Sequence, residues 1–293
     1  MKLHFMKHRK LAYGISVALI VLSVVSLIWR GLNFGIDFSG GILMEVAPVS
    51  SDYTIDKMRA DLNHFAPELQ EVAESHTIML RVGLHKEANE VQQNAAVKEI
   101  KDILGDKVEY RQVQIIGPKI GGELVRGGVL AILVSFLLMS IYIWIRYKGG
   151  YAMGSLISLT LDFILMFGFF SVAGLEFNQT AIAVILMGIG YSMNDKVVNY
   201  DRIEENIKKY HKMPMTEIID LSVNEMMHRT ILTASAVFLT MAALYLFAGE
   251  VLREFSIAMM FCIILGTLTS IYISNVVLIH FSLRKEHSLL ETN

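Results

Sequence analysis

The sequence has little of what a disulfide-bonded or metal-binding protein needs. It contains one cysteine, Cys262, which lies inside an apolar run and so offers neither an intramolecular disulfide nor a thiol metal site. Its nine histidines show no metal-ligand spacing, and it has no Gly-x-x-x-x-Gly-Lys-Ser/Thr loop for ATP hydrolysis. We therefore expect no bound metal or cofactor and no enzymatic activity.

Charge is scarce as well. Only 18% of the 293 residues are charged, against roughly 25% in an average soluble domain, whereas 54% are hydrophobic and the mean hydropathy is +0.48. The net charge of −2 gives no indication of nucleic-acid binding. The shortage of charge indicates a protein that lies largely in lipid.

Six apolar runs are long enough to cross a bilayer as helices, for which about 20 residues suffice. They cover residues 11–29, 127–145, 151–175, 177–200, 230–249 and 255–283. The third contains Asp162, the fourth contains Asp195 and Lys196, and the others lack such charges. The alternating pattern of a membrane β-barrel is absent. The first run is longer than the apolar region of a signal peptide, about 7–15 residues, and no A-x-A site follows it, so we expect an anchor.

Lysine and arginine in the short loops predict the orientation. They gather in the N-terminal arm, in the loops after the second and fourth spans and in the C-terminal tail, whereas the opposite short loops carry only Arg253. Both termini are therefore expected in the cytoplasm. The expected parts are a cytoplasmic arm with the first span (1–29), an extracytoplasmic domain (30–126), spans two to four (127–201), a cytoplasmic loop with an interfacial helix (202–229), spans five and six (230–283) and a cytoplasmic tail (284–293).

The extracytoplasmic segment is expected to fold as a small α+β domain. The pattern predicts strands at 42–47, 69–74, 77–84 and 108–116, and helices at 54–65 and 88–104. The order β-α-β-β-α-β is that of a ferredoxin-like domain. In the second helix, the buried face is expected to contain Val91, Ala95, Ile100 and Leu104. Elsewhere, the apolar face of residues 216–227 predicts a short amphipathic helix along the membrane surface.

Two stretches combine glycine with charge. The first, Gly31-Leu-Asn-Phe-Gly-Ile-Asp-Phe-Ser-Gly-Gly, directly follows the first span. Gly35, Gly40 and Gly41 permit positive φ or close backbone approach, and Asp37 can accept hydrogen bonds from its own turn. We expect this stretch to form a rigid joint between the first span and the outer domain.

The second stretch is a polar stripe on the fourth span. At helical spacing one face of this span carries Gly188, Ser192, Asp195, Asn199 and Arg202. Ionisable groups are costly in contact with lipid, so this face is expected to point into a helix bundle.

Two further residues could act together with Asp195. Asp162 is a second carboxylate near the middle of the third span, and Arg229, beside His228 at the start of the fifth, is a candidate counter-ion. Carboxylates and a guanidinium in one bundle are the parts of a proton relay, because burial and a neighbouring cation both change the proton affinity of a carboxylate. The alternatives are that Asp162 is a structural hydrogen-bond acceptor and that Arg229 only anchors its helix at the membrane surface.

Three stretches taken together resemble one protein family. Residues 31–46, 190–206 and 228–233 are similar to the signature motifs of the SecD/SecF family of bacterial protein-export subunits, part of the RND superfamily. The resemblance covers nearly the whole chain, with six spans and one outer domain between the first two. It implies an RND-type half bundle whose related half is another polypeptide.

The resemblance also implies a function. A SecD/SecF pair uses the proton motive force, or sodium in some members, to help pull a preprotein from the SecYEG channel after SecA has pushed it in. The implied partners are SecD, SecYEG, SecA, YajC, the translocating preprotein and the lipid of the inner membrane. The coupling ion, H⁺ or Na⁺, is the only small species implied.

The family's functional residues carry over by position. Asp195 matches the Asp of an Asn-Asp pair in the ion pathway, and Arg229 matches the basic residue of the fifth span. The other signature residues are Gly35, Asp37, Gly40, Gly41, Gly190, Asn194, Asp201, Arg202 and Asn206. Two positions depart from the family pattern: Leu161 precedes Asp162 where His is common, and Lys196 follows Asp195 where Thr is common.

Lys196 is the harder departure to place. A cation within about 4–6 Å would change the proton affinity of Asp195, but adjacent residues on a helix do not face each other. Its position near the cytoplasmic end of the span favours a stem that snorkels to the interface. The alternatives are a pair with Asp162 or with a carboxylate of the partner subunit, and a locked pair with Asp195. We expect Asp195 to be the coupling carboxylate and Lys196 to adjust its proton affinity.

Two other functions stay open at this point. One is a half-size RND-type exporter of small molecules or lipids, although no large apolar cleft is evident in the outer domain. The other is a scaffold that stabilises the export complex without coupling ions.

Overall fold

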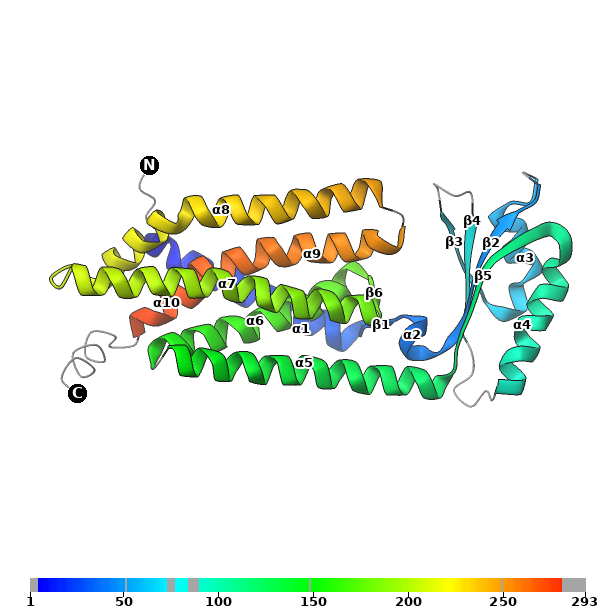
Figure 1. Cartoon of the computed structure of the whole chain (residues 1–293), viewed down its shortest axis with the longest axis horizontal. Coiled ribbons are helices and arrows are strands. Elements are labelled where there is room, and N and C mark those ends of the chain that lie inside the picture. Colours follow the sequence, from blue (N-terminus) through cyan, green and yellow to red (C-terminus); the bar gives the residue numbers. More distant parts are fainter. Residues whose placement is uncertain are drawn as a thin grey trace. The chain divides into compact units, whose positions relative to one another are not determined.

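The computed structural model describes residues 5–50, 52–72, 77–83, 90–147, 149–248 and 250–280 (Figure 1). The chain divides into two compact units. The helical unit comprises Met1–Asn33, Ile132–Leu175 and Ala181–Asn293, and the α+β unit comprises Phe34–Ala131 and Glu176–Thr180.

Six helices are long and apolar enough to cross a membrane, as predicted. They are α1 (Arg9–Trp29), α5 (Pro118–Arg146), α6 (Gly150–Ala173), α7 (Gln179–Lys209), α8 (Met215–Phe247) and α9 (Glu250–Leu268), which continues through a π-helix, η4 (Thr269–Ser274), into α10 (Asn275–Val277). Short 3₁₀ turns, η1 (Phe5–His8) and η5 (Leu278–His280), precede α1 and follow α10. Residues 281–283, the end of the predicted sixth span, lie outside the described residues. Exposed apolar side chains such as Leu133 and Ile145 fit lipid contact, whereas α6, α7 and α9 supply most of the buried positions.

Small residues let the helices of this unit approach closely. A Cβ added to Gly168 on α6 would overlap the side chain of Ser23 on α1, and Ser26 and Ser171 share a hydrogen bond of 2.8 Å between the same helices. A Cβ on Gly188 of α7 would overlap the sulfur of Cys262 on α9. Small side chains at contact points are the usual means of bringing membrane helices together, because lipid offers no hydrophobic driving force between them.

The α+β unit has the predicted β-α-β-β-α-β order. Its elements are β2 (Gly41–Pro48), α3 (Ile55–Asp61), β3 (Glu68–Val72), β4 (Thr77–Gly83), α4 (Glu90–Leu104) and β5 (Val108–Ile116), with 3₁₀ turns η2 (Asn63–Phe65) and η3 (Gly105–Lys107) after the two helices. The antiparallel sheet has the order β3-β4-β2-β5, and both helices cover the same face (Figure 1). The predicted α+β, ferredoxin-like class is confirmed. Residues 73–74, 84 and 88–89 of the predicted elements lie outside the described residues.

Alternation along the strands builds the core of this unit. Ile42, Met44 and Val46 of β2 are fully buried and lie across from Val82, Leu80 and Ile78 of β4. Successive side chains of a strand point to opposite faces, so these apolar positions share the face that the helices cover. Met58 of α3, Leu62 directly after it, and Ile100 and Leu104 of α4 also belong to the core cluster.

Two predictions about helices are wrong in detail. The buried face of α4 contains Gln93, Ala96, Val97, Ile100 and Leu104, whereas Val91 and Ala95 are exposed. The buried face is therefore turned relative to the predicted one and includes the polar side chain of Gln93. Residues 216–227 form the first turns of α8 and not a separate helix, because no glycine or proline interrupts the sequence between Met215 and Phe247.

Candidate functional site

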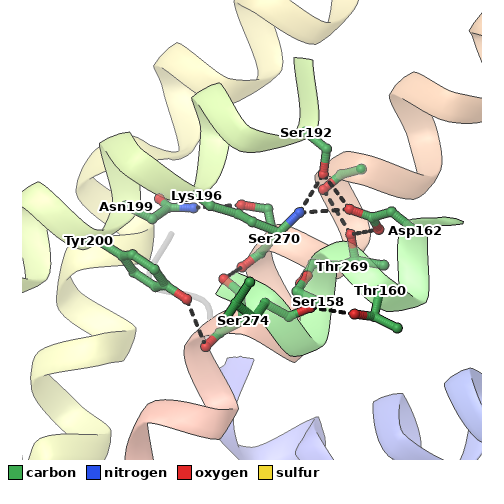
Figure 2. A network of polar contacts seen from close by, with 12 residues as sticks. Ser158, Thr160, Asp162, Ser192, Lys196, Asn199, Tyr200, Thr269, Ser270 and Ser274 are labelled. Carbon is green, nitrogen blue, oxygen red and sulfur yellow. Dashed lines mark hydrogen bonds and ion pairs between the residues drawn. The ribbon is translucent and has the colours of Figure 1, made fainter. Parts of the chain in front are cut away.

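Asp162 is the centre of a buried polar network in the helical unit. It lies near the middle of α6 and only 5% of the residue is exposed. Its Oδ2 accepts hydrogen bonds from Ser192 Oγ at 2.6 Å and from Lys196 Nζ at 2.7 Å, and its Oδ1 accepts one from Thr269 Oγ1 at 2.6 Å. The carboxylate is thus held from both α7 and η4 (Figure 2).

Lys196 belongs to this network and does not lie at the membrane surface. The residue is 0% exposed, its Nζ forms the ion pair with Asp162, and it also donates to Ser192 Oγ one turn earlier on α7. The prediction that its stem snorkels to the interface is therefore wrong. Of the alternatives, the structure shows the pair with Asp162. If the Lys196 side chain extended to the membrane surface instead, Asp162 would be buried without a counter-charge, and that arrangement would be less stable than the pair.

The network continues along α7 and the π-helix. Asn199 Nδ2 donates to Ser270 Oγ at 3.3 Å, and Tyr200 OH donates to the backbone oxygen of Ser274 at 3.3 Å. Ser158 Oγ of α6 donates to the backbone oxygen of Thr269 at 3.4 Å (Figure 2). A π-helical turn interrupts the regular helix hydrogen bonds and is frequent at functional sites. The sequence signal that could have found this segment is its run of hydroxyl residues, Thr267, Thr269, Ser270 and Ser274, in an otherwise apolar span.

Asp195 lies apart from the Asp162 network. It is 4% exposed, and its Oδ2 has no hydrogen-bond partner among the described residues. The hydroxyls of Tyr191 and Thr267 are its neighbours and are buried as well. Neighbours on a helix point in different directions, which separates this carboxylate from the Lys196 ammonium.

The predicted counter-ion is nearby but unpaired. Arg229 on α8 is exposed, close enough for its charge to act on Asp195, and forms no ion pair within 4.0 Å with another described residue.

The prediction of a buried polar stripe on α7 is confirmed for Gly188, Ser192, Asp195 and Asn199. A Cβ on Gly190 would meet nothing within 4 Å, and Asn194 is exposed.

The signature residues at the end of α7 join this helix to its neighbours. Asp201 Oδ1 accepts hydrogen bonds from Arg146 at 2.6 Å and from Tyr147 OH at 2.7 Å. Arg202 Nε donates to Glu225 Oε2 of α8 at 2.7 Å, and the same oxygen accepts a bond of 2.8 Å from buried Asn206. Sequence reasoning missed Glu225, because its charge fits an ordinary solvated helix face.

From Phe34 onwards, the glycine-rich stretch forms a compact turn inside the α+β unit. It contains α2 (Ile36–Ser39), and Asp37 Oδ2 accepts a bond of 3.3 Å from the backbone N–H of Gln179, the first residue of α7. A carboxylate at a helix N-terminus satisfies a free N–H and complements the helix dipole. Gly40 has φ +75°, and Gly35 N donates to the Phe177 oxygen in β6 (Glu176–Phe177) at 3.1 Å. Gly41 is a strand residue, the first of β2, and pairs with Gly83 and Ile116.

Comparison with known protein families gives two matches. The family described as "Protein export membrane protein SecD/SecF, C-terminal" matches residues 96–284, and the family described as "SecD/SecF GG Motif" matches residues 25–48. The second match covers the glycine-rich turn, and the first covers every residue of the Asp162 network.

Individual relatives agree with these families. The chain is 43% identical to the "Protein translocase subunit SecF" of Rickettsia felis and 42% identical to that of Rickettsia bellii, in each case over 96% of this chain and 92% or 94% of the relative. Among solved structures it is similar to SecDF from Thermus thermophilus, described as a translocon-associated membrane protein, with a TM-score of 0.82 at 25% identity over 97% of this chain. It spans 39% of that longer chain. A second structure, SecDF in a "Super-membrane-facing form", has a TM-score of 0.72 at 25% identity, over 100% of this chain and 40% of the other.

The resemblance in the sequence is therefore confirmed over nearly the whole chain, and with it the expectation of a transport protein and not an enzyme. The chain is a multi-pass membrane protein that belongs to the SecD/SecF family of protein-export membrane proteins, and the relatives named above are SecF subunits.

Proposed function

We propose that this chain is a motor subunit of protein export, which works with a SecD partner and uses an ion gradient to help draw preproteins out of the SecYEG channel. Asp195 carries the proposal. It is a buried carboxylate in an apolar helix, and one of its oxygens has no hydrogen-bond partner among the described residues. Buried polar atoms are normally bonded, as both oxygens of Asp162 are, so an unbonded one calls for a function. Uptake and release of a proton is the function that a carboxylate at this depth can perform.

The other residues have supporting roles in this proposal. Arg229 provides a positive charge that acts on Asp195. The Asp162–Lys196 pair holds α6, α7 and η4 together next to it. Asp201, Arg202 and Asn206 connect the far end of α7 to Arg146 and to Glu225 on α8, so that a change at Asp195 can be transmitted along a rigid helix.

The proposal includes a location and a set of partners. The distribution of Lys and Arg supports an inner-membrane protein with both termini in the cytoplasm and residues 30–126 outside it. Its partners are SecD, SecYEG, SecA, YajC, the translocating preprotein and membrane lipid. The names of its relatives, translocase subunit and translocon-associated protein, support this assignment. A small-molecule exporter has no comparable support.

The variant Asp195→Asn separates a motor from a scaffold. Export of a preprotein is measured in membrane vesicles with and without a proton motive force, together with co-purification of SecD. The variant is expected to lose the stimulation by the proton motive force while it still co-purifies with SecD, because an amide cannot take up a proton. The control Asp56→Asn makes the same change at a side chain that is 84% exposed and should leave export unchanged. Full stimulation in Asp195→Asn would show that the chain is a scaffold.

A further inference from the structure

The position of the Lys196 ammonium has the make-up of a monovalent cation site. Within hydrogen-bond reach of Nζ lie a carboxylate oxygen, Asp162 Oδ2, and a hydroxyl oxygen, Ser192 Oγ. A second hydroxyl, Thr269 Oγ1, bonds the other oxygen of the same carboxylate at 2.6 Å. Hard cations take oxygen ligands of these kinds, and π-helical turns such as η4 are frequent at functional sites.

The protein's own charge occupies this position. Lys196 is 0% exposed, and its ammonium forms an ion pair with Asp162. The other groups around it are the hydroxyls of Ser192 and Thr269, the buried thiol of Cys262 and the carboxylate of the preceding residue, Asp195. A second cation bound to Asp162 would lie directly beside the ammonium in a low-dielectric surrounding, where the repulsion between them is strongly unfavourable. A sodium ion can bind to Asp162 only where the ammonium is absent.

Asp195 is the carboxylate that this arrangement leaves for a mobile ion. Its Oδ2 is unbonded among the described residues, and its charged neighbours are Lys196 on the same helix and Arg229 on α8. The polar groups that face it are single hydroxyls, from Tyr191 of α7 and Thr267 of α9. One free carboxylate oxygen is enough to bind a proton.

We infer that Lys196 is a tethered cation that fills the Asp162 site and excludes sodium from it. Removal of the ammonium then opens a sodium site formed by Asp162, Ser192 and Thr269. The inference goes beyond the proposed function, because it concerns the Asp162 site and the proposed function rests on Asp195. Sodium binding to the purified chain is measured without any export reaction, so the two can fail independently.

The test is thermal unfolding of the purified full-length chain in detergent, in NaCl or in N-methylglucamine chloride at equal ionic strength. The parent chain is expected to unfold at the same temperature in both salts. Without sodium, Lys196→Thr is expected to unfold at a lower temperature than the parent. Its unfolding temperature is expected to rise by about 3 °C or more when the sodium concentration is ten times the dissociation constant. The double variant Lys196→Thr with Asp162→Asn is expected to lose the sodium response. Lys208→Thr, at a lysine of α7 that is 54% exposed, is the matched control and should behave as the parent.

Three results would overturn the inference. The first is a saturable sodium response in the parent that Asp162→Asn abolishes. The second is a folded Lys196→Thr, or the second neutral variant Lys196→Gln, that shows no sodium response. The third is failure of both neutral variants to fold in sodium while Lys196→Arg folds, because the lysine would then be a structural counter-ion that sodium cannot replace. None of these results bears on whether Asp195→Asn loses its response to the proton motive force.

Discussion

Lys196 Nζ lies 2.7 Å from Asp162 Oδ2, and the two side chains are 0% and 6% exposed. The pair joins α6 to α7, and each of its charges would be costly in contact with lipid. Thr269 of the π-helix η4 donates a hydrogen bond to the same carboxylate. Each charge is tolerated because the other is present. The pair is thus a condition for placing Asp195, the next residue on α7, inside the same bundle.

Breaking this pair from one side is expected to destabilise the chain more than removing it altogether. Lys196→Met leaves a buried carboxylate uncompensated and should lower the unfolding free energy by about 3–5 kcal/mol, whereas Lys196→Met with Asp162→Leu should recover most of that loss. Denaturation in mixed micelles without sodium gives the three values and their coupling energy. A double variant as unstable as the sum of both single variants would show that the two charges do not interact.

The close packing of α1 on α6 is expected to require glycine at position 168. A Cβ on Gly168 would overlap the Ser23 side chain and approach its Cα at 2.8 Å, so Gly168→Ala must push the helices apart. Overpacking of this kind lowers the unfolding free energy by about 1–3 kcal/mol. Gly14→Ala on α1, where an added Cβ meets nothing within 4 Å, is the control and should leave stability unchanged or slightly higher. Equal melting temperatures for the two variants would mean that α1 is not tightly packed on α6.

Much of the fold follows from periodicity in the sequence. Apolar runs of span length predict the six helices, and alternation in β2 and β4 predicts the buried residues Met44 and Leu80, because both patterns reflect which face of an element leaves water. The buried face of α4 was misjudged because Gln93 is polar, and burial of a polar side chain depends on what the rest of the unit places around it.

The candidate site could be predicted only in part. Helical spacing placed Ser192, Asp195 and Asn199 on one buried face of α7, which needs no knowledge of other helices. The partner of Lys196 depends on how far α7 stands from α6, and small contacts such as Gly154 against Tyr200 set that distance. The spacing of residues along one helix therefore cannot show whether Lys196 pairs with a residue of another helix or extends to the membrane surface. The π-helix has no signal in local periodicity at all.

Glu225 is expected to matter for stability although it was not singled out from the sequence. Its Oε2 accepts bonds from Arg202 at 2.7 Å and from Asn206 at 2.8 Å, and Asn206 is 1% exposed. Glu225→Ala removes one acceptor of a buried amide and should lower the unfolding free energy by about 1–3 kcal/mol.

The control for Glu225 is Glu205→Ala. Glu205 also binds Arg202, at 2.6 Å, but is 64% exposed, so its loss should change the unfolding free energy by less than about 1 kcal/mol. Denaturation of both variants under the same conditions checks the difference. If the two variants lose equal stability, the amide of Asn206 is satisfied without Glu225.

Asp61 is expected to give the α+β unit a stability that acid removes. Its Oδ2 accepts hydrogen bonds from Lys107 Nζ at 2.8 Å and from Tyr53 OH at 2.7 Å, and these bonds, first that of Lys107, hold the pKa of Asp61 below its usual range. Because the folded-state pKa is depressed, the contribution is complete above the unfolded value, about 3.9, and is lost as the pH falls through the lower folded value.

Asp61→Asn should therefore lower stability at pH 7 and have a smaller effect at the acid end of the accessible range. The difference should stay below about 1 kcal/mol, because both partners are partly exposed and screened by solvent. Asp56→Asn on the same helix, at a side chain that is 84% exposed, is the matched control. Thermal unfolding of the full chain between pH 3 and pH 7 gives both profiles. A loss in Asp61→Asn that grows as the pH falls would have the opposite sign and would show that the carboxylate destabilises the folded unit.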